Sequence, residues 1–427
     1  MLGLLAVPLL AVMLAIGVPV AFSFALVTGF LALIYDANLN TLMMQGYRSL
    51  DSVVLLALPL FIFTGYLMER GGIARRIIEF VGRIATGRAG MGNVIVLSSA
   101  IFGAIAGTAS AAVASMGTIM SQPMVERGYP RGYTAALLGV SSLLGILIPP
   151  SITMILFAVV TRQSVAACFA ASIGPAMVLI IGLIIFNRIT VARNPEILPP
   201  PRDDTRSFAR MALSAAPALT LPFIILGGIY GGYVTPTEAA AVAAVVSIVL
   251  GLFVYRELKL RNLAEALVRT AETTGSIILI LMFSFLISRI MASERVPQDL
   301  SEAVQGFAVS PIAAILLVNV VLIIAGALMD DVSCTVVVAP LFLPLMESSG
   351  VSPVQFASIV ACSVVIGANS PPMAPILYMS CRVCRASVLE AVRPALLILT
   401  FVALPVMLLA SFFPELSLAL PRWAGLL

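Results

Sequence analysis

The 427-residue sequence contains no histidine, and only 10% of its residues are charged. Without histidine the chain cannot build imidazole metal sites, histidine proton relays or a serine–histidine hydrolase. The low charge is incompatible with a soluble domain, in which about 25% of residues are charged. Tryptophan occurs once, and we expect this residue, Trp423, at the outer interface of a membrane.

Cysteine is scarce as well. The five cysteines include one Cys-x-x-Cys sequence, from Cys381 to Cys384, without a second pair. A single pair of this kind is weak evidence for a metal or redox site. We interpret both residues as small side chains at a helix end, and a metal or redox site is the alternative.

Apolar residues dominate instead: 61% of the residues are hydrophobic, and the mean hydropathy is +1.11. Many windows of about 17–25 residues carry no charge, which is enough to cross about 30 Å of hydrocarbon. We therefore predict an all-α polytopic membrane protein, whose first apolar stretch is a spanning helix rather than a signal peptide. The ten predicted crossings are residues 1–16, 18–35, 52–69, 132–161, 169–188, 211–231, 236–255, 273–292, 354–381 and 390–413.

Two further apolar regions, residues 91–124 and 311–346, do not have the pattern of simple crossings. Each is too long for one helix and is interrupted near its middle, at Ala106–Ser110 and at Leu328–Ser333. The resulting pieces, of about 15 residues each, are short for a full span. We predict that each region is a re-entrant hairpin.

The distribution of basic residues predicts the orientation. With the N-terminus outside, most of the 24 lysine and arginine residues lie in the inner loops, as the positive-inside rule requires. Basic residues flank the hairpin 91–124 on both sides, so it opens to the inside, and the acidic flanks of 311–346 place its opening outside. Both chain termini are then periplasmic, and the polar, proline-rich segment 193–210 is a cytoplasmic linker.

Matching features in the two halves of the chain suggest an internal repeat. Pro149-Pro150 is followed 222 residues later by Pro371-Pro372, and Gly128 at the same spacing by Gly350. Each half holds five crossings and one hairpin, and because five is odd, the halves are predicted to be inverted relative to each other. The alternative is a chance match in a proline-rich chain. The predicted repeats are residues 1–192, with hairpin 91–124 and interrupted helix 132–161, and residues 211–427, with hairpin 311–346 and interrupted helix 354–381.

The two proline pairs predict ion sites. Proline frees the carbonyl four residues before it, and an interrupted helix at membrane depth persists only where it lines a polar cavity. The freed carbonyls belong to Gly145, Ile146, Gly367 and Ala368. Such oxygens suit a hard monovalent cation, usually Na⁺. Nearby side chains that could complete the coordination are Ser141, Ser142, Ser151, Asn369 and Ser370.

The hairpin tips carry polar residues that we expect near the same region. The first tip offers Thr108 and Ser110, and the second offers Asp330 and Asp331, followed by Ser333 and Thr335. The two aspartates could cap the following helix and nothing more, or could cap it and also take part in ion coupling. Helix N-termini at both tips would attract an anionic substrate such as a carboxylate.

Three further segments have a predicted structural role. Val234–Ala240 begins a helix with Thr235 as N-cap and Glu238 at the third position. Glu69–Phe80 and Leu260–Glu272 are predicted to be helices that frame the protein at the inner interface, with contact to a partner as the alternative.

The chain resembles the large membrane subunit of the TRAP transporters (tripartite ATP-independent periplasmic transporters), the DctM type. Five stretches in the family's order carry the resemblance: LPLFIFTGYLMERGGIARRI, GAIAGTASAAVASMGTI, ERGYPRGYTAALLGVSSLLGILIPPSI, GYVTPTEAAAVAA and GALMDDVSCTVVVAPLFLPL. The resemblance implies an elevator-type secondary transporter of the ion transporter superfamily in the bacterial inner membrane. It implies sodium coupling, import of an organic acid, a periplasmic substrate-binding protein and a small four-helix membrane subunit. Because the chain starts at its first helix, we expect that small subunit to be a separate chain.

The resemblance also implies a set of site residues. The first sodium site would comprise Thr108, Ser110, Ser141, Gly145, Ile148 and Pro150. The second would comprise Gly326, Asp330, Asp331, Gly367, Asn369, Ser370 and Pro372. The substrate would contact Thr108, Ser151, Asp331 and Ser370.

Two positions depart from the family pattern. The first tip, usually Ser-Gly-Ser, is Ala106-Gly107-Thr108 here, so one hydroxyl is missing. The second interruption, usually Thr-Pro-Pro, is Ser370-Pro371-Pro372, which keeps its hydroxyl. The loss at Ala106 weakens the case for a side-chain ligand at that position, whereas backbone ligands would be unaffected.

Three other functions were weighed. A stand-alone symporter or anion exporter of the same superfamily would share the fold and need no binding protein. An intramembrane aspartyl protease needs two facing carboxylates from separate helices, whereas Asp330 and Asp331 are adjacent. A passive channel is disfavoured by the predicted inverted repeat.

Overall fold

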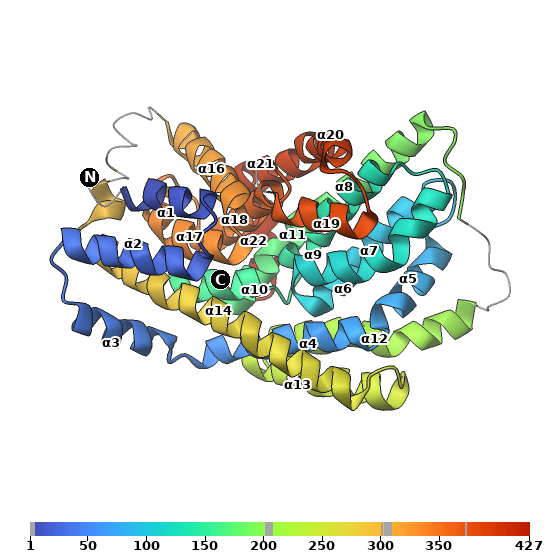
Figure 1. Cartoon of the computed structure of the whole chain (residues 1–427), viewed down its shortest axis with the longest axis horizontal. Helices are drawn as coiled ribbons and strands as arrows, with labels where there is room; N and C mark the ends of the chain where they lie inside the picture. The colour runs from blue at the N-terminus through green and yellow to red at the C-terminus, as the bar shows by residue number, and fades with distance from the viewer. Residues whose placement is uncertain (1–4, 201–207, 300–301, 303–309, 372–373) are drawn as a thin grey trace.

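The computed structural model describes residues 5–200, 208–299, 302, 310–371 and 374–427, and every regular element in these ranges is a helix. Figure 1 shows two layers. One layer, along the lower edge of the view, contains α2 (Val20–Ile34), α3 (Leu39–Leu50), α4 (Ala57–Arg70), α12 (Phe208–Tyr230), α13 (Pro236–Val249) and α14 (Leu260–Ser293). The other layer contains the two predicted hairpins and the helices that follow them.

Both predicted hairpins are pairs of helices with a short break. The first consists of α6 (Gly90–Ala106) and α7 (Ala109–Glu126), and the second of α16 (Pro311–Leu328) and α17 (Asp331–Ser348). Their arms have 17 or 18 residues, which is longer than the predicted 15 or so, and α16 and α17 are each long and apolar enough to span a membrane. The arms are longer because each helix continues up to the residues of the tip itself.

Both predicted interruptions are confirmed. In the first half, α8 (Arg131–Ser142) and α9 (Leu144–Leu147) lead to a break before α10 (Ile152–Thr161), and the helix axis bends by 45° across it. In the second half, α18 (Pro353–Gly367) is separated from α19 (Pro375–Cys384) by residues 368–374. Pro372, a predicted sodium ligand, lies outside the described residues.

The remaining helices connect and enclose these parts. The 29-residue α11 (Val165–Arg193) follows α10, and α20 (Val388–Ile398), the π-helical turn η4 (Leu399–Ala403) and α21 (Leu404–Phe412) follow α19. The shorter elements are α1 (Ala6–Ala15), η2 (Val53–Leu56), α5 (Ile73–Ile84), η3 (Leu250–Val254) and α22 (Pro414–Trp423).

The ten predicted crossings are borne out in part. Within the described residues, eight helices have the length and hydropathy of a span, or nine when the bent pair is counted as one. Two of the eight are the hairpin arms α16 and α17; the other six and the bent pair correspond to seven of the ten predicted crossings. The predicted crossings 1–16 and 18–35 contain α1 with 10 residues and α2 with 15, short of the roughly 20 residues that a span requires. A turn at Gly17, with φ +86°, separates these two helices. Two helices, α3 and α22, were not predicted at all.

The predicted helix start at Val234–Ala240 is confirmed. The segment predicted as a framing helix, residues 69–80, contains the end of α4 and most of α5. The Thr235 and Glu238 side chains form a reciprocal capping box at the start of α13. In α5, Ile73, Ile77 and Val81 are buried on one face.

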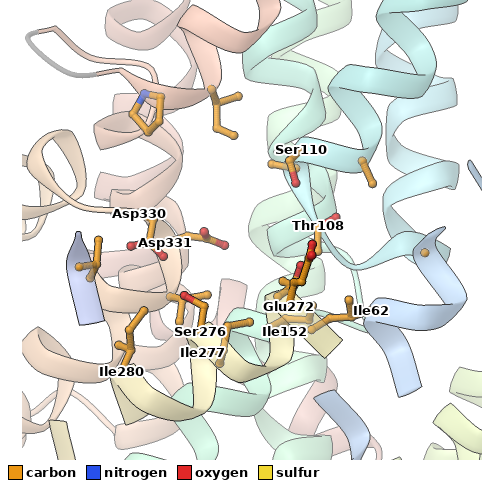
Figure 2. Close-up of a pocket in the computed structure, with 18 of the residues that line it drawn as sticks. Ile62, Thr108, Ser110, Ile152, Glu272, Ser276, Ile277, Ile280, Asp330 and Asp331 are labelled. Atoms are coloured by element: carbon orange, nitrogen blue, oxygen red, sulfur yellow. The ribbon is translucent and has the colours of Figure 1, made fainter. Parts of the chain in front are cut away.

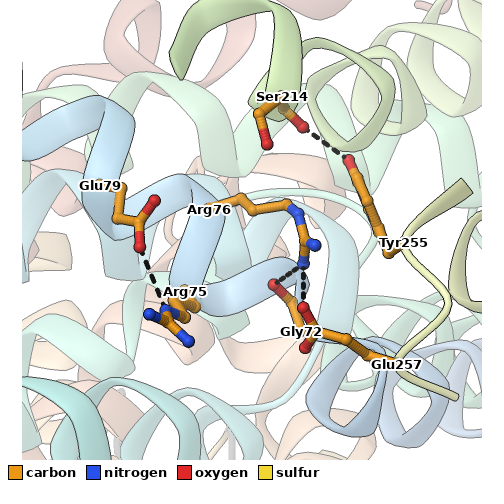
Figure 3. A network of polar contacts seen from close by, with 7 residues as sticks. All are labelled: Gly72, Arg75, Arg76, Glu79, Ser214, Tyr255 and Glu257. Carbon is orange, nitrogen blue, oxygen red and sulfur yellow. Dashed lines mark hydrogen bonds and ion pairs between the residues drawn. The ribbon is translucent and has the colours of Figure 1, made fainter. Parts of the chain in front are cut away.

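A polar network connects α5 to Tyr255 and Glu257, which follow α13 and η3 in the chain (Figure 3). The Arg76 guanidinium stacks 3.9 Å from the centre of the Tyr255 ring, and its Nη1 lies 2.8 Å from a Glu257 carboxylate oxygen. Arg76 also donates to the Gly72 carbonyl, and the Tyr255 hydroxyl donates to the Ser214 carbonyl on α12. These contacts fix α5 against the layer that holds α12 and α13.

A buried polar cluster joins the first hairpin to its neighbours. The Tyr133 hydroxyl on α8 donates to Asn187 Oδ1 on α11 at 3.0 Å, and Asn187 Nδ2 donates to Asn93 Oδ1 on α6 at 2.8 Å. Buried amides and hydroxyls are costly unless paired, so this cluster specifies how the three helices pack.

The second hairpin has a corresponding cluster. Asn319 Nδ2 on α16 donates to Ser411 Oγ on α21 at 2.9 Å, and Gln355 Nε2 on α18 donates to the Ala410 and Ser411 carbonyls at 3.0 and 3.1 Å. In both halves, therefore, a buried polar cluster links the first hairpin arm, the first part of the interrupted helix and the closing helix.

Candidate functional site

A cavity of about 1060 Å³ lies between the two layers. One side is formed by both hairpin tips, with Thr108 and Ser110 from the first and Asp330 and Asp331 from the second (Figure 2). The facing side comes from α14 and α4; the labelled residues of this side in Figure 2 are Glu272, Ser276, Ile277, Ile280 and Ile62. Residues more than 200 positions apart in the sequence thus line the same cavity.

Four helices begin at this cavity. Its lining includes the first residues of α7 (Ala109), α10 (Ile152), α17 (Asp331) and α19 (Pro375). The first turn of a helix has unpaired backbone N–H groups and the positive end of the helix dipole. Four such ends around one cavity favour the binding of an anion.

At the first tip, the hairpin and the interrupted helix meet backbone to backbone. A Cβ on Gly103 would lie 2.6 Å from the Gly145 Cα, and one on Gly145 would lie 3.1 Å from the Thr108 carbonyl oxygen. Gly107 ends α6 with φ +67°, and the Ile152 N–H donates to its carbonyl at 3.5 Å. Glycine is required at these positions because any side chain would separate the tip from the break.

The residues of the predicted first sodium site lie in two groups. Thr108 and Ser110 line the cavity, and the Thr108 hydroxyl does not cap α7 although Thr108 is its N-cap residue. Ser141 is fully buried behind the tip, and its hydroxyl has no hydrogen-bond partner among the described residues. The structure places Gly145, Ile148 and Pro150 at or beside the break, behind the cavity surface.

The second tip has the same type of backbone contact. A Cβ on Gly367 would lie 2.5 Å from the Gly326 carbonyl carbon, which brings α18 against α16. Asn369 is fully buried and its Oδ1 has no hydrogen-bond partner among the described residues, although it faces α8, where a Cβ on Gly139 would lie 2.7 Å from it. The Ser370 hydroxyl donates to the Ile366 carbonyl at 2.8 Å.

The two aspartates have different environments. Asp330 is the N-cap of α17: its carboxylate accepts hydrogen bonds from the Ser333 N–H and hydroxyl, as predicted for a capping residue. Asp331 instead accepts a hydrogen bond of 2.9 Å from the Thr153 hydroxyl on α10. The second of the adjacent acids is therefore held by the interrupted helix of the other half.

Thr153 is a site residue that the sequence did not reveal. It lies 178 residues from Asp331, is fully buried, and follows a double proline whose pattern drew attention to backbone carbonyls instead. Ser151, a predicted substrate contact, is fully buried, accepts a hydrogen bond from the Met154 N–H as the N-cap of α10, and is absent from the cavity lining.

Buried oxygens near the tips could complete a cation site. Three of them lack a hydrogen-bond partner among the described residues: Ser141 Oγ, Thr335 Oγ1 and Asn369 Oδ1. Neutral oxygens of this kind are ligands suited to Na⁺. Two of the four carbonyls predicted to be free are not, because the Gly367 and Ala368 carbonyls accept hydrogen bonds from the Ser370 and Ile376 N–H groups at 2.9 and 3.2 Å. Acidic residues also outnumber basic ones in the cavity lining, with Glu69, Glu272, Asp330 and Asp331 against Arg269.

Comparison with known proteins identifies the family to which this architecture belongs. Residues 7–416 match the family model described as the tripartite ATP-independent periplasmic transporter, DctM component. The chain is 35% identical over 394 residues to the C4-dicarboxylate TRAP transporter large permease protein DctM of Pseudomonas aeruginosa, covering 91% of each chain. It is 30% identical to the sialic acid TRAP transporter large permease protein SiaM of Vibrio cholerae, covering 95% of each chain. It is 31% identical to the isethionate TRAP transporter permease protein DctMQ of Oleidesulfovibrio alaskensis, covering 96% of this chain and 64% of that protein.

The fold also has a solved counterpart. The crystal structure of the Alcanivorax borkumensis YdaH transporter matches with a TM-score of 0.58 and 12% identity, covering 88% of both chains. At this level of identity the match establishes the fold alone.

Proposed function

The chain belongs to the DctM component family of the tripartite ATP-independent periplasmic transporters, and from this premise we propose that it couples the inward movement of Na⁺ to the import of an organic acid. It is the large permease subunit of such a transporter and a multi-pass protein of the bacterial inner membrane. The observation that carries the proposal is the convergence of four helix N-termini on one cavity whose lining also holds Asp330 and Asp331.

This combination suits an anion and a cation together. The N-termini of α7, α10, α17 and α19 direct the positive ends of their helix dipoles toward an acidic substrate. The carboxylates would repel the same anion unless a cation accompanies it, because like charges in a poorly solvated cavity interact strongly. Binding of Na⁺ beside the tips would therefore favour binding of the acid, and this mutual dependence is what a symporter requires.

The unpartnered oxygens support two cation sites, one behind each tip. Ser141 belongs to the first half, and Thr335 and Asn369 belong to the second. Ser141 lies on α8 before the first interruption, Asn369 lies in the second interruption, and Thr335 lies near the start of α17. In this proposal the glycine contacts Gly103–Gly145 and Gly326–Gly367 keep each tip against its interrupted helix, so that both can contribute oxygens to one ion.

The same pairs of contacts support an inverted repeat. Gly145 and Gly367 are 222 residues apart, as are Tyr133 and Gln355, and each member occupies the equivalent place in its half. We infer two repeats, residues 1–192 and 211–427, joined by a cytoplasmic linker at 193–210. The hairpins and interrupted helices would move together against α4 and α14 as an elevator.

The remaining parts of the proposal concern substrate and partners. The names of the relatives mention C4-dicarboxylates, sialic acid and isethionate, all of which are organic acids. We propose that the substrate of this chain is a carboxylate delivered by a periplasmic binding protein. A separate small four-helix membrane subunit would complete the transporter.

The test is uptake of radiolabelled succinate, N-acetylneuraminate and isethionate into proteoliposomes that contain the chain and both cognate partners. We expect one of these acids to accumulate in an inward Na⁺ gradient and not when choline replaces Na⁺. Accumulation that is unaffected by choline would refute sodium coupling. Full uptake without the binding protein and the small subunit would instead favour the stand-alone symporter.

A further inference from the structure

We propose that Arg269 on α14 binds the acidic group of the substrate from the side of the cavity opposite the hairpin tips, and so contributes to the selection of anions. The inference rests on the proposed function and adds a substrate contact that the hairpins and interrupted helices do not supply. It was not among the residues expected from the sequence to form the site.

The first argument is position. Arg269, Glu272, Thr273 and Ser276 all line the cavity, and their spacing of three, four and seven residues places them on one face of α14. A hydrogen bond of 3.0 Å between the Tyr66 hydroxyl on α4 and the Thr273 hydroxyl fixes this part of α14 against its neighbour. Arg269 therefore lies on a face of α14 that is hydrogen-bonded to α4, and it is one helical turn from other residues that line the cavity.

The second argument is charge. Arg269 is the only basic residue in the described cavity lining, and its side chain is exposed there. The structure pairs other basic residues of this region: Arg261 and Arg70 both contact Glu265, at 3.1 and 3.9 Å. For Arg269 no ion pair is found within the described part of the chain, although Glu69 and Glu272 line the same cavity.

The third argument is chemical fit. A guanidinium presents its N–H groups as a planar fork that matches two oxygens of a carboxylate or sulfonate, and it stays charged at any physiological pH. The helix N-termini at the tips offer only partial charges. The guanidinium of Arg269 therefore supplies the full positive charge that the hairpin tips lack. Glu69 and Glu272, which line the same cavity, weaken the attraction so that the anion can dissociate.

Succinate is the probe for this inference, measured as initial uptake rates at a saturating, fixed concentration of binding protein; where the wild type accumulates N-acetylneuraminate or isethionate instead, that acid takes the place of succinate in every measurement below. We expect Arg269→Gln to raise the half-saturating succinate concentration at least tenfold, with the half-saturating Na⁺ concentration changed less than twofold. Arg269→Lys, which keeps the charge but loses the fork, is expected to lie between Arg269→Gln and the wild type. Arg261→Gln, which removes a charge from the same helix outside the cavity, is the matched control and should behave as wild type.

An Arg269→Gln variant with the succinate dependence of the wild type would overturn the inference. So would equal losses in Arg269→Gln and Arg269→Lys that appear in the maximal rate and thermal stability alone, because these indicate a structural role. Failure of the wild type to take up any of the three acids with Na⁺ counts against the proposed function, and that result is separate from any difference among the variants.

Discussion

Gly103 and Gly145 approach each other so closely that a Cβ on Gly103 would lie 2.6 Å from the Gly145 Cα. This contact joins α6 to α9 directly behind the first tip, and Gly326 and Gly367 repeat it behind the second. Only backbone atoms meet at either crossing. The position of each tip therefore depends on a pair of glycines, because a side chain on either one would hold the two backbones apart.

Gly103→Ala should separate the tip from the interrupted helix. Overpacking in a close-packed interior typically costs about 1–3 kcal/mol, and here the backbone rather than a flexible side chain would have to shift. We expect a lower thermal unfolding temperature and loss of uptake. Gly29→Ala is the control, since a Cβ at Gly29 has nothing within 4 Å. Equal behaviour of the two variants would contradict the proposed importance of the contact.

Thr153→Val removes the hydroxyl that donates to Asp331 while keeping the shape of the side chain. A hydrogen bond to a charged group contributes about 1.5–3 kcal/mol, and its loss leaves the Asp331 carboxylate free to turn away from the cavity. We expect a several-fold rise in the Na⁺ concentration needed for half-maximal uptake. Thr153→Ser restores the donor and should recover most of the wild-type sodium dependence; a serine variant as impaired as the valine variant would argue against this hydrogen bond.

The aspartates of the second tip should separate into a capping role and a coupling role. Asp330→Ala removes the N-cap of α17 and should lower stability by about 0.5–2 kcal/mol. Asp331→Asn should leave the unfolding temperature near that of the wild type and abolish sodium-dependent uptake. Thermal unfolding and uptake measured on the same preparations distinguish the two, and full transport by Asp331→Asn would rule out a coupling role for Asp331.

Asn187→Leu tests the buried cluster of the first half. It would leave the Tyr133 hydroxyl and the Asn93 amide without their shared partner. Each unpaired buried polar group costs about 1–3 kcal/mol, so we expect a marked loss of thermal stability. Asn194→Leu is the control, because the Asn194 side chain is exposed and, among the described residues, its one hydrogen bond is to the Thr190 carbonyl on α11. A similar unfolding temperature for both variants would show that the cluster does not stabilise the packing.

Local signals predicted the features that are themselves local. Proline pairs marked both interruptions and Gly107 marked the first tip, since these residues limit or extend the backbone angles at their own positions, and the adjacent acids Asp330 and Asp331 marked the second tip. The capping box at Thr235 and the N-cap at Asp330 followed from side chains within three residues of the helix start. The predicted boundary between residues 1–16 and 18–35 falls at the turn of Gly17, but the lengths of α1 and α2 were overestimated because the apolar composition continues beyond the helix ends.

Contacts between distant segments could not be predicted. Nothing in the spacing of Thr153 and Asp331 indicates that they meet, and the polar clusters around Asn187 and Gln355 depend on the packing of three helices each. Arg269 lies in a stretch that was predicted only as a framing helix, because a helix face shows its partner only after the layers are placed. The sequence thus predicted where the helices are interrupted but not which distant side chains contact the interruptions.

The four helix ends at the cavity have one more consequence. Their attraction for negative charge comes from peptide dipoles, which neither gain nor lose protons. The chain has no histidine, and the arginine on the opposite wall keeps its charge throughout the physiological range. Under the proposed function, any dependence of uptake on pH would therefore arise from the carboxylates of the cavity and not from its electropositive groups.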